Sequence, residues 1–270
     1  MTPMTGTAID ATLLAALRHI AEGAGAAIMD VYEGRIAADV RRKIDHSPVT
    51  AADDAAEAHI LSALRDLTPD IPVISEEAAE AGTLPDTSGG RFWLVDPMDG
   101  TKEFLERNGE FTVNIALIED GHPAAGVVHA PALGKTWAGA GTGTAAYFEG
   151  GKAPLPIRAR QIPAAGAVVA VSRRHGDAAA MDAFLKTIKV DSHLAAGSSL
   201  KFCLVASGQA DVYPRFGRTM EWDTAAGHAV LLAAGGRVHR ADGGADGGTT
   251  LTYGKPGFEN PPFIARGLPA

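Results

Sequence analysis

The chain has 270 residues, of which 46% are hydrophobic and 21% charged, a composition typical of a globular protein and not of a disordered one. A formal charge of −8 disfavours a broad nucleic-acid-binding surface, because such binding depends on clustered Lys and Arg side chains. The one cysteine, Cys203, excludes an internal disulfide. The longest stretch without a charged residue, 121–134, is too short for a membrane helix of about 20 apolar residues.

These properties predict a cytoplasmic protein without a membrane span, with peripheral attachment at the inner membrane as the alternative. The first basic residue is Arg18, so we do not expect a signal peptide, which would begin with a basic segment.

The first part of the chain combines helical patterns with a hairpin signal. Apolar residues three or four positions apart predict an amphipathic helix over 9–28. Thr50 is suited to cap a second helix over 51–67, and Asp120-Gly121 is typical of a tight hairpin turn. Strands are expected over residues 71–74, 92–95, 111–119, 124–130 and 147–148.

Beyond residue 163 the expected strands and helices alternate, which favours an α/β arrangement. The expected strands cover 167–171 and 211–213, and the expected helices cover 177–186, 199–207 and 223–234. The Gly-rich stretch 241–248 is expected to form a surface turn. We therefore expect a mixed α/β protein with an α+β N-terminal half, residues 1–163, and an α/β C-terminal half, residues 164–270.

The segment Asp96-Pro97-Met98-Asp99-Gly100-Thr101 carries the clearest chemical signal. It places two carboxylates three positions apart at the end of a buried strand. Pro97 fixes the backbone, and Gly100 permits a conformation that is costly for other residues. Carboxylate and carbonyl oxygens are the ligands of hard cations such as Mg²⁺, and a helix beginning after Gly100 would offer N–H groups to a phosphate. The alternative is a tight turn with two solvated aspartates.

Two further acidic segments lie at the ends of expected elements. Glu76-Glu77 follows the strand at 71–74, and Asp223 precedes an Ala-rich helix. Each segment alone is explained as well by helix capping, with Ser75 as the cap of the first and acidic side chains in the first turn. Because all three acidic segments lie at strand or helix ends, their side chains can meet in one cleft.

A second group of segments is basic or polar. It consists of Ser172-Arg173-Arg174-His175, Gly197-Ser198-Ser199-Leu200-Lys201 and Arg215. Two serines at a helix start, followed by a lysine that does not complement the helix dipole, suit an anion. A plain helix cap with a solvated lysine is the alternative. Cys203 lies in an apolar run and is expected in the core.

The acidic motifs, in this order and spacing, resemble the signature set of the inositol monophosphatase superfamily, whose members are Mg²⁺-dependent, lithium-sensitive phosphomonoesterases. Further segments resemble the CysQ-type 3'(2'),5'-bisphosphate nucleotidases within it. They are SPVTAAD at 47–53, GTKEF at 100–104, NGEFTVN at 108–114, GSSLKF at 197–202 and YGKPGF at 253–258. The resemblance extends over residues 9–264. It implies a layered αβαβα sandwich with two or three Mg²⁺ ions in the cleft between the halves.

The resemblance also implies roles for single residues. Glu76, Asp96 and the Met98 carbonyl would hold one metal ion, and Asp96, Asp99 and Asp223 a second. Asp53 would reach a third ion through water, near Lys43, and Thr101 with Glu76 would position the attacking water. The residues implied at the phosphates are Gly100, Thr101, Ser198, Lys201 and Arg215, and those implied on the adenosine side are Ser172, Arg173 and His193.

Two positions depart from the family's pattern. Met98 stands where Leu is usual, which matters little if the ligand is a carbonyl. Arg218 stands where we expect a proline, so the nucleotide pocket is less closely defined than the metal site.

The resemblance implies hydrolysis of the 3'-phosphate of adenosine 3',5'-bisphosphate to AMP and phosphate, which removes a by-product of sulfate assimilation. The partner would be a small phosphorylated nucleotide and not a nucleic acid polymer. The first alternative is an inositol or sugar phosphomonoesterase with the same metal centre, for which Lys201 and Arg215 would be idle. The second is a non-catalytic regulatory binding protein. The sequence leaves the oligomeric state open between monomer and homodimer.

Overall fold

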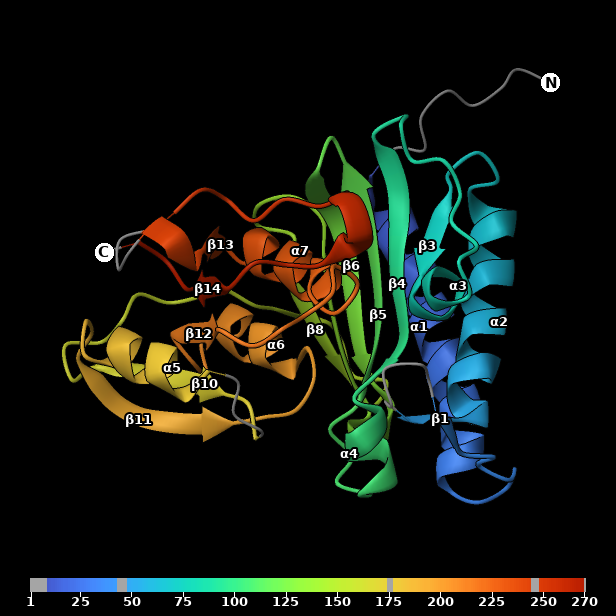
Figure 1. The fold of residues 1–270 in the computed structure, drawn as a ribbon, viewed down its shortest axis with the longest axis horizontal. Helices are drawn as coiled ribbons and strands as arrows, with labels where there is room; N and C mark the ends of the chain where they lie inside the picture. The colour runs from blue at the N-terminus through green and yellow to red at the C-terminus, as the bar shows by residue number, and fades with distance from the viewer. Residues whose placement is uncertain (1–8, 43–47, 174–176, 244–247, 270) are drawn as a thin grey trace.

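The computed structural model describes residues 9–42, 48–173, 177–243 and 248–269. Five layers follow one another: a helix pair, a seven-stranded sheet, a second helix pair, a five-stranded sheet and an outer helix (Figure 1). The expected αβαβα sandwich is thereby confirmed. Among the described residues, no helix combines the length and the apolar character that crossing a bilayer requires.

The outermost layer on the N-terminal side consists of α1 (Ala11–Tyr32) and α2 (Ala51–Leu67). Thr50 caps α2 as expected: its hydroxyl accepts a hydrogen bond from the Ala52 N–H, and the Asp53 carboxylate accepts one from the Thr50 N–H. A short ribbon formed by β1 (Arg41–Arg42) and β2 (Pro48–Val49) precedes α2.

The larger sheet is built from the segment between α2 and residue 156. Its strands, in spatial order, are β3 (Val73–Ser75), β4 (Arg91–Asp99), β5 (Thr112–Glu119), β6 (His122–Ala130), β7 (Lys135–Gly139), β8 (Ala146–Glu149) and β9 (Leu155–Pro156). Only β3 and β4 run parallel. The hairpin between β5 and β6 is confirmed, with Asp120 and Gly121 both in the left-handed region at φ 48° and 76°. The sequence patterns had not predicted β7.

The smaller sheet has both parallel and antiparallel pairs. Its strands, in spatial order, are β11 (Val190–Ala195), β10 (Ala167–Val171), β12 (Val212–Arg215), β14 (Phe263–Arg266) and β13 (Arg237–Arg240). Strand β10 pairs in parallel with β11 and β12, whereas β14 runs antiparallel to β12 and β13. The sequence patterns predicted β10 and β12 but not β11, β13 or β14. Helix α5 (Ala178–Leu185) begins after the N-cap Asp177 and packs against the outer face of this sheet.

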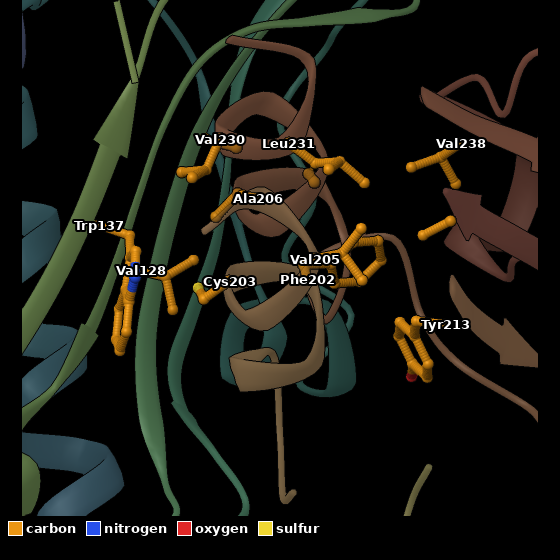
Figure 2. Close-up of a cluster of buried hydrophobic side chains, with 14 of the residues drawn as sticks. Val128, Trp137, Phe202, Cys203, Val205, Ala206, Tyr213, Val230, Leu231 and Val238 are labelled. Atoms are coloured by element: carbon orange, nitrogen blue, oxygen red, sulfur yellow. The ribbon is translucent and has the colours of Figure 1, made fainter. Parts of the chain in front are cut away.

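Two helices, α6 (Leu200–Ala206) and α7 (Ala225–Ala233), fill the space between the sheets. Figure 2 shows Cys203 directed toward Val128 and Trp137 of the larger sheet, whereas Phe202 lies on the side of Tyr213, its ring centroid 5.2 Å from that of Tyr213. A side chain at Gly227 of α7 would collide with the Phe202 ring, so a small residue is required there. Burying each large side chain contributes about 1.5–3 kcal/mol.

This central core draws on both halves of the chain. Residues before 157 supply the strands of the larger sheet, and residues after 166 supply those of the smaller one. One cluster of buried side chains continues from the larger sheet through α6 and α7 to the smaller sheet. The division into domains at residues 1–163 and 164–270 stays a prediction.

Candidate active site

The Asp96–Thr101 turn lies at the end of β4, where the strand pairing with β5 is interrupted between Asp96 and Asp99. The Asp96 carboxylate accepts a hydrogen bond from the Met98 N–H (3.0 Å), which stiffens the turn. Gly100 adopts φ 96°, and a Cβ there would collide with the Ser198 hydroxyl, so only glycine fits. The short helix α4 (Thr101–Leu105) begins directly after it.

Ser199, the residue before α6, joins this turn to the start of α7. Its hydroxyl lies 3.1 Å from Asp99 Oδ2 and 2.7 Å from the main-chain oxygen of Asp223. The same hydroxyl accepts a hydrogen bond from the Asn114 side chain of β5 (2.9 Å). The two aspartates, 124 positions apart in the chain, are therefore held at one place by a single side chain.

Asp223 does not cap α7, contrary to the helix-capping explanation. The helix begins at Ala225 with Thr224 as N-cap, and the Asp223 carboxylate instead accepts a hydrogen bond from the Met220 N–H (2.8 Å). Ser75 does cap α3 (Glu76–Glu80) through the Ala78 N–H (3.3 Å), which places Glu76 in the first turn at the end of β3.

The Asp223 carboxylate is repelled by those of Asp99 and Glu76, and we call these three residues, together with Asp96 of β4, the acidic corner. Burial, followed by the charges of Asp99 and Glu76, raises the pKa of Asp223 well above its ordinary value. Burial also raises the pKa of Asp99, although the Lys201 charge opposes this shift. Asp96 is buried at the end of the same strand. Carboxylates crowded in this way favour a cation beside them.

Thr101 and Asp53 meet next to the acidic corner. The Thr101 hydroxyl donates to Asp53 Oδ1 (3.4 Å), while Asp53 Oδ2 accepts from the Thr50 N–H and hydroxyl at the start of α2. Within the described ranges, no three Asp, Glu, His or Cys side chains already form a coordination shell for a metal ion. Lys43, expected near a third ion, lies outside the described residues, as do 244–247 of the predicted surface turn.

A cavity of about 440 Å³ opens beside Asp99 and Asp223. Several cations line it, and we call Arg173, Lys201 and Arg215 the basic wall. Lys201 is buried, with its ammonium group at 2.5 Å from the Ser198 oxygen and 3.2 Å from the Ala196 oxygen. Burial lowers the pKa of Lys201 to about 8, against the raising effect of Asp99.

Arg215 and Arg173 are each held by a neighbouring group. The Arg215 guanidinium donates to the Ser172 hydroxyl (3.0 Å) and to the Arg218 main-chain oxygen (3.1 Å). Arg173 forms a two-pronged ion pair with Glu110 (2.9 and 2.5 Å), which lowers the pKa of Glu110. Arg215 therefore faces the cavity with its position fixed, whereas Arg173 is neutralised by its own partner.

Ser198 contacts main-chain groups rather than standing free at the cavity it lines. Its backbone is left-handed, at φ 46°, and its hydroxyl lies within hydrogen-bonding distance of the Asp99 oxygen (2.9 Å) and the Glu110 oxygen (2.8 Å). The structure thus places Ser198 as a brace for the turn that carries Asp99.

A second cavity, of about 390 Å³, adjoins the first and shares Ser172, Arg215 and Gly217 with it. We call it the base cavity. His193 of β11 lines this cavity and not the first one. Its other walls are chiefly apolar and come from the end of β10, from α5 and from the end of β12. The apolar residues are Val171, Met181, Leu185, Pro214 and Phe216.

Sequence reasoning assigned no role to Glu110, Asn114 or Glu221. Glu110 holds Arg173 and also accepts from the Gly197 N–H (2.7 Å). Asn114 holds Ser199. Glu110 and Asn114 lie in the segment 108–114, which resembles the bisphosphate nucleotidases. This resemblance was the sequence feature that could have indicated a role for the two residues. Their partners are 63 to 87 positions away, beyond the reach of any local pattern.

A layered αβαβα fold with an acidic corner beside a basic wall defines a class of phosphate-handling proteins, and comparison identifies the family. Residues 10–265 match the model of the inositol monophosphatase family. The chain therefore belongs to this family, which confirms the predicted superfamily.

Individual relatives point to one branch of the family. The 3'(2'),5'-bisphosphate nucleotidase CysQ of Salmonella typhimurium is 50% identical over 247 residues, 91% of this chain and 96% of that protein. The protein of the same name from Escherichia coli strain K12 is 50% identical over 222 residues, 82% and 87% of the two chains. The crystal structure of CysQ from Bacteroides thetaiotaomicron is 34% identical, with a TM-score of 0.76 over 96% of this chain and 98% of that one.

Proposed function

We propose that this protein is a metal-dependent phosphatase that removes the 3'-phosphate of adenosine 3',5'-bisphosphate, giving AMP and phosphate. Relatives at 50% identity that carry the name 3'(2'),5'-bisphosphate nucleotidase support this activity. The observation that carries the proposal is the pairing, within one cavity, of Asp99 and Asp223 with Lys201 and Arg215. The carboxylates would bind the scissile phosphate through a cation, and the basic side chains would bind a second anionic group directly.

The proposed cofactor is Mg²⁺, as two or three ions held by the side chains of the acidic corner and the Met98 carbonyl. The residues present fit this ion in two respects. All the donors are oxygens, which Mg²⁺ prefers, and a cation would offset the burial and the repulsion by Asp99 and Glu76 that together raise the pKa of Asp223. When bound, such ions lower the pKa of a water and stabilise the charge on the departing oxygen.

The protein's own residues then orient the attacking water. The Thr101 hydroxyl donates a hydrogen bond to Asp53, so the lone pairs of Thr101 Oγ1 are left to accept a hydrogen bond from the attacking water. We propose that Glu76 accepts the other water proton from its place at the start of α3. Asp53 is itself fixed by Thr50, so the Thr101 hydroxyl keeps one orientation.

The second phosphate would lie at Lys201 and Arg215, with Gly100 and Ser198 shaping the wall beside it. A buried ammonium group has lost much of its hydration and gains more from an anion than an exposed one does. Inositol 1-phosphate has no second phosphate to offer. The adenine would occupy the base cavity, where apolar side chains suit a planar ring, with Ser172 and His193 at its edge.

The test is phosphate release from purified protein with two substrates, adenosine 3',5'-bisphosphate and inositol 1-phosphate. We expect release from the bisphosphate, its loss on adding EDTA, and its return with excess Mg²⁺. Preference for inositol 1-phosphate would support the sugar phosphatase alternative. Release unaffected by EDTA would contradict the metal centre, and no release from either substrate would favour the regulatory binding protein. A cytoplasmic location and a role in sulfur assimilation belong to the same proposal.

A further inference from the structure

A buried ion pair lies two residues from Asp223 and takes no part in the proposed chemistry. The Glu221 carboxylate is 0% exposed and forms an ion pair with the Lys255 ammonium group at 2.6 Å. It also accepts hydrogen bonds from the Gly254 N–H (2.6 Å) and the Lys255 N–H (2.9 Å). Three donors from one short segment therefore converge on this carboxylate.

Asn260 binds the same turn from its other side. Its side-chain amide donates to the Met220 oxygen (2.8 Å) and to the Thr224 hydroxyl (3.0 Å), and its backbone N–H donates to the Thr219 oxygen (2.9 Å). The Lys255 ammonium group lies 3.2 Å from Asn260 Oδ1, which connects the two sets of contacts. The segment 253–260 thus holds the turn 219–224 along its whole length.

This turn determines where the Asp223 carboxylate points. Met220 is the link, because its N–H donates to Asp223 Oδ2 (2.8 Å) while its carbonyl accepts from Asn260. Fixing the Met220 backbone on one side therefore fixes one oxygen of Asp223 on the other. Residues that orient a metal ligand in this way commonly control metal affinity without touching the metal.

A simple stabilising role does not explain the choice of residues. An ion pair with a fully buried carboxylate and a partly exposed lysine contributes little net stability, because the desolvation of Glu221 offsets much of the attraction. It does, however, impose one geometry, since a buried carboxylate with three donors cannot rotate without losing them. The Lys255 charge also neutralises Glu221, which would otherwise add to the repulsion around Asp223.

We propose that Glu221, Lys255 and Asn260 are positioning residues that set the orientation of Asp223 for divalent-cation binding. This inference rests on the metal centre of the proposed function. It assigns a role to the tail segment 253–258, whose sequence resembles that of the bisphosphate nucleotidases but to which no function was attached.

The test measures Mn²⁺ binding to the substrate-free protein by calorimetry, beside steady-state kinetics. We expect Glu221→Gln to weaken Mn²⁺ binding by about 10- to 100-fold, the usual cost of removing a group that orients a ligand. The KM for adenosine 3',5'-bisphosphate at saturating Mg²⁺ should change less than about twofold. Asn260→Ala, which introduces no charge, should give a smaller loss in the same direction, and Lys255→Arg should retain most of the affinity.

Asp211→Asn is the matched control. Asp211 is also 0% exposed, forms a two-pronged ion pair with Arg160 (2.7 and 3.2 Å) and accepts from the Val168 N–H (2.7 Å), but none of these partners touches the turn 219–224. It should lower the unfolding temperature and leave Mn²⁺ affinity within about twofold.

Equal losses of Mn²⁺ affinity in Glu221→Gln and Asp211→Asn would overturn the inference in favour of general destabilisation. Unchanged affinity in folded Asn260→Ala and Glu221→Gln would overturn it as well. If Glu221→Gln does not fold, Asn260→Ala decides alone. If the wild-type protein binds no Mn²⁺, the metal centre itself fails, which is distinguishable because neither the wild type nor the Asp211→Asn control then binds the ion.

Discussion

Asp99 and Asp223 of the acidic corner line the same cavity as the basic wall, but the two regions are built in opposite ways. Asp96 and Asp99 come from one strand end, and burial, followed by the charges of Asp99 and Glu76, raises the pKa of Asp223. In the basic wall, each cation is held by a separate partner: carbonyls for Lys201, a hydroxyl and a carbonyl for Arg215, and Glu110 for Arg173.

This difference suits the acidic corner to binding a catalytic cation and the basic wall to recognising the substrate. Groups that repel in the cation-free protein gain most when a cation arrives, at a cost in stability that is common in active sites. Cations that already have hydrogen-bond or ion-pair partners in the protein gain less free energy when a ligand binds, but their positions are fixed, so they offer the ligand a rigid surface. Disrupting the corner should therefore abolish the reaction, whereas disrupting the wall should change the choice of substrate.

The largest effect is expected from Asp99→Asn. Loss of one cation ligand should lower kcat/KM for the bisphosphate by about 10³-fold or more, because charge stabilisation by the metal contributes several kcal/mol and about 1.4 kcal/mol corresponds to a factor of ten. The metal-free variant should unfold at a higher temperature than the wild type, since one repelling charge is gone. Phosphate release and thermal unfolding measure the two effects.

Asp66→Asn, an exposed carboxylate on α2, serves as the control and should alter neither quantity. Activity of Asp99→Asn within about tenfold of wild type would contradict the assignment of Asp99 to the acidic corner.

Lys201→Ala should have the next largest effect, and only on one substrate class. A hydrogen bond to a charged group contributes about 1.5–3 kcal/mol, so KM for adenosine 3',5'-bisphosphate should rise by about 10- to 100-fold. Hydrolysis of inositol 1-phosphate, however slow, should lose much less. Equal losses for both substrates would show that Lys201 supports the site as a whole and does not bind the second phosphate.

The pH profile tests the same group without a substitution. The pKa of Lys201 is lowered to about 8, so its ammonium form predominates below this pH and disappears above it. The attraction for the second phosphate is therefore present at pH 7, and kcat/KM for the bisphosphate should fall as the pH rises through about 8. The pH dependence of kcat/KM reports ionisations of the free enzyme. Inositol 1-phosphate has no second phosphate, so its kcat/KM should not fall with the loss of the Lys201 charge. An equal fall of kcat/KM at high pH for both substrates would refute this explanation.

The smallest effect is expected from Arg173→Met. Its guanidinium is already paired with Glu110 and its side chain is 47% exposed, and exposed ion pairs contribute at most about 1 kcal/mol. KM for the bisphosphate should rise less than about fivefold. A much larger rise would mean that Arg173 leaves Glu110 to contact the substrate, which would move it into the same group as Lys201.

Several features could be predicted from the sequence because they depend on neighbours in the chain. The Thr50 cap, the Asp120-Gly121 hairpin and the sharp turn at Gly100 each arise from residues at most four positions apart. The layered αβαβα fold, by contrast, was implied by the resemblance of the motifs to the inositol monophosphatase superfamily, whereas the residue patterns alone predicted an α+β half followed by an α/β half. The metal, catalytic and substrate roles of single residues stay predictions, supported by where the structure places them.

What the sequence by itself determined was the local geometry and, through the order of its motifs, the family. Only the tertiary structure decided that Ser199 joins Asp99 to Asp223, that Glu110 neutralises Arg173, and that Ser198 braces a turn. It also decided that Asp223 accepts from Met220 instead of capping a helix. The physical reason is that these contacts join segments brought together by the packing of two sheets on α6 and α7. A single side chain's hydrogen-bonding capacity cannot show which distant partner it will meet.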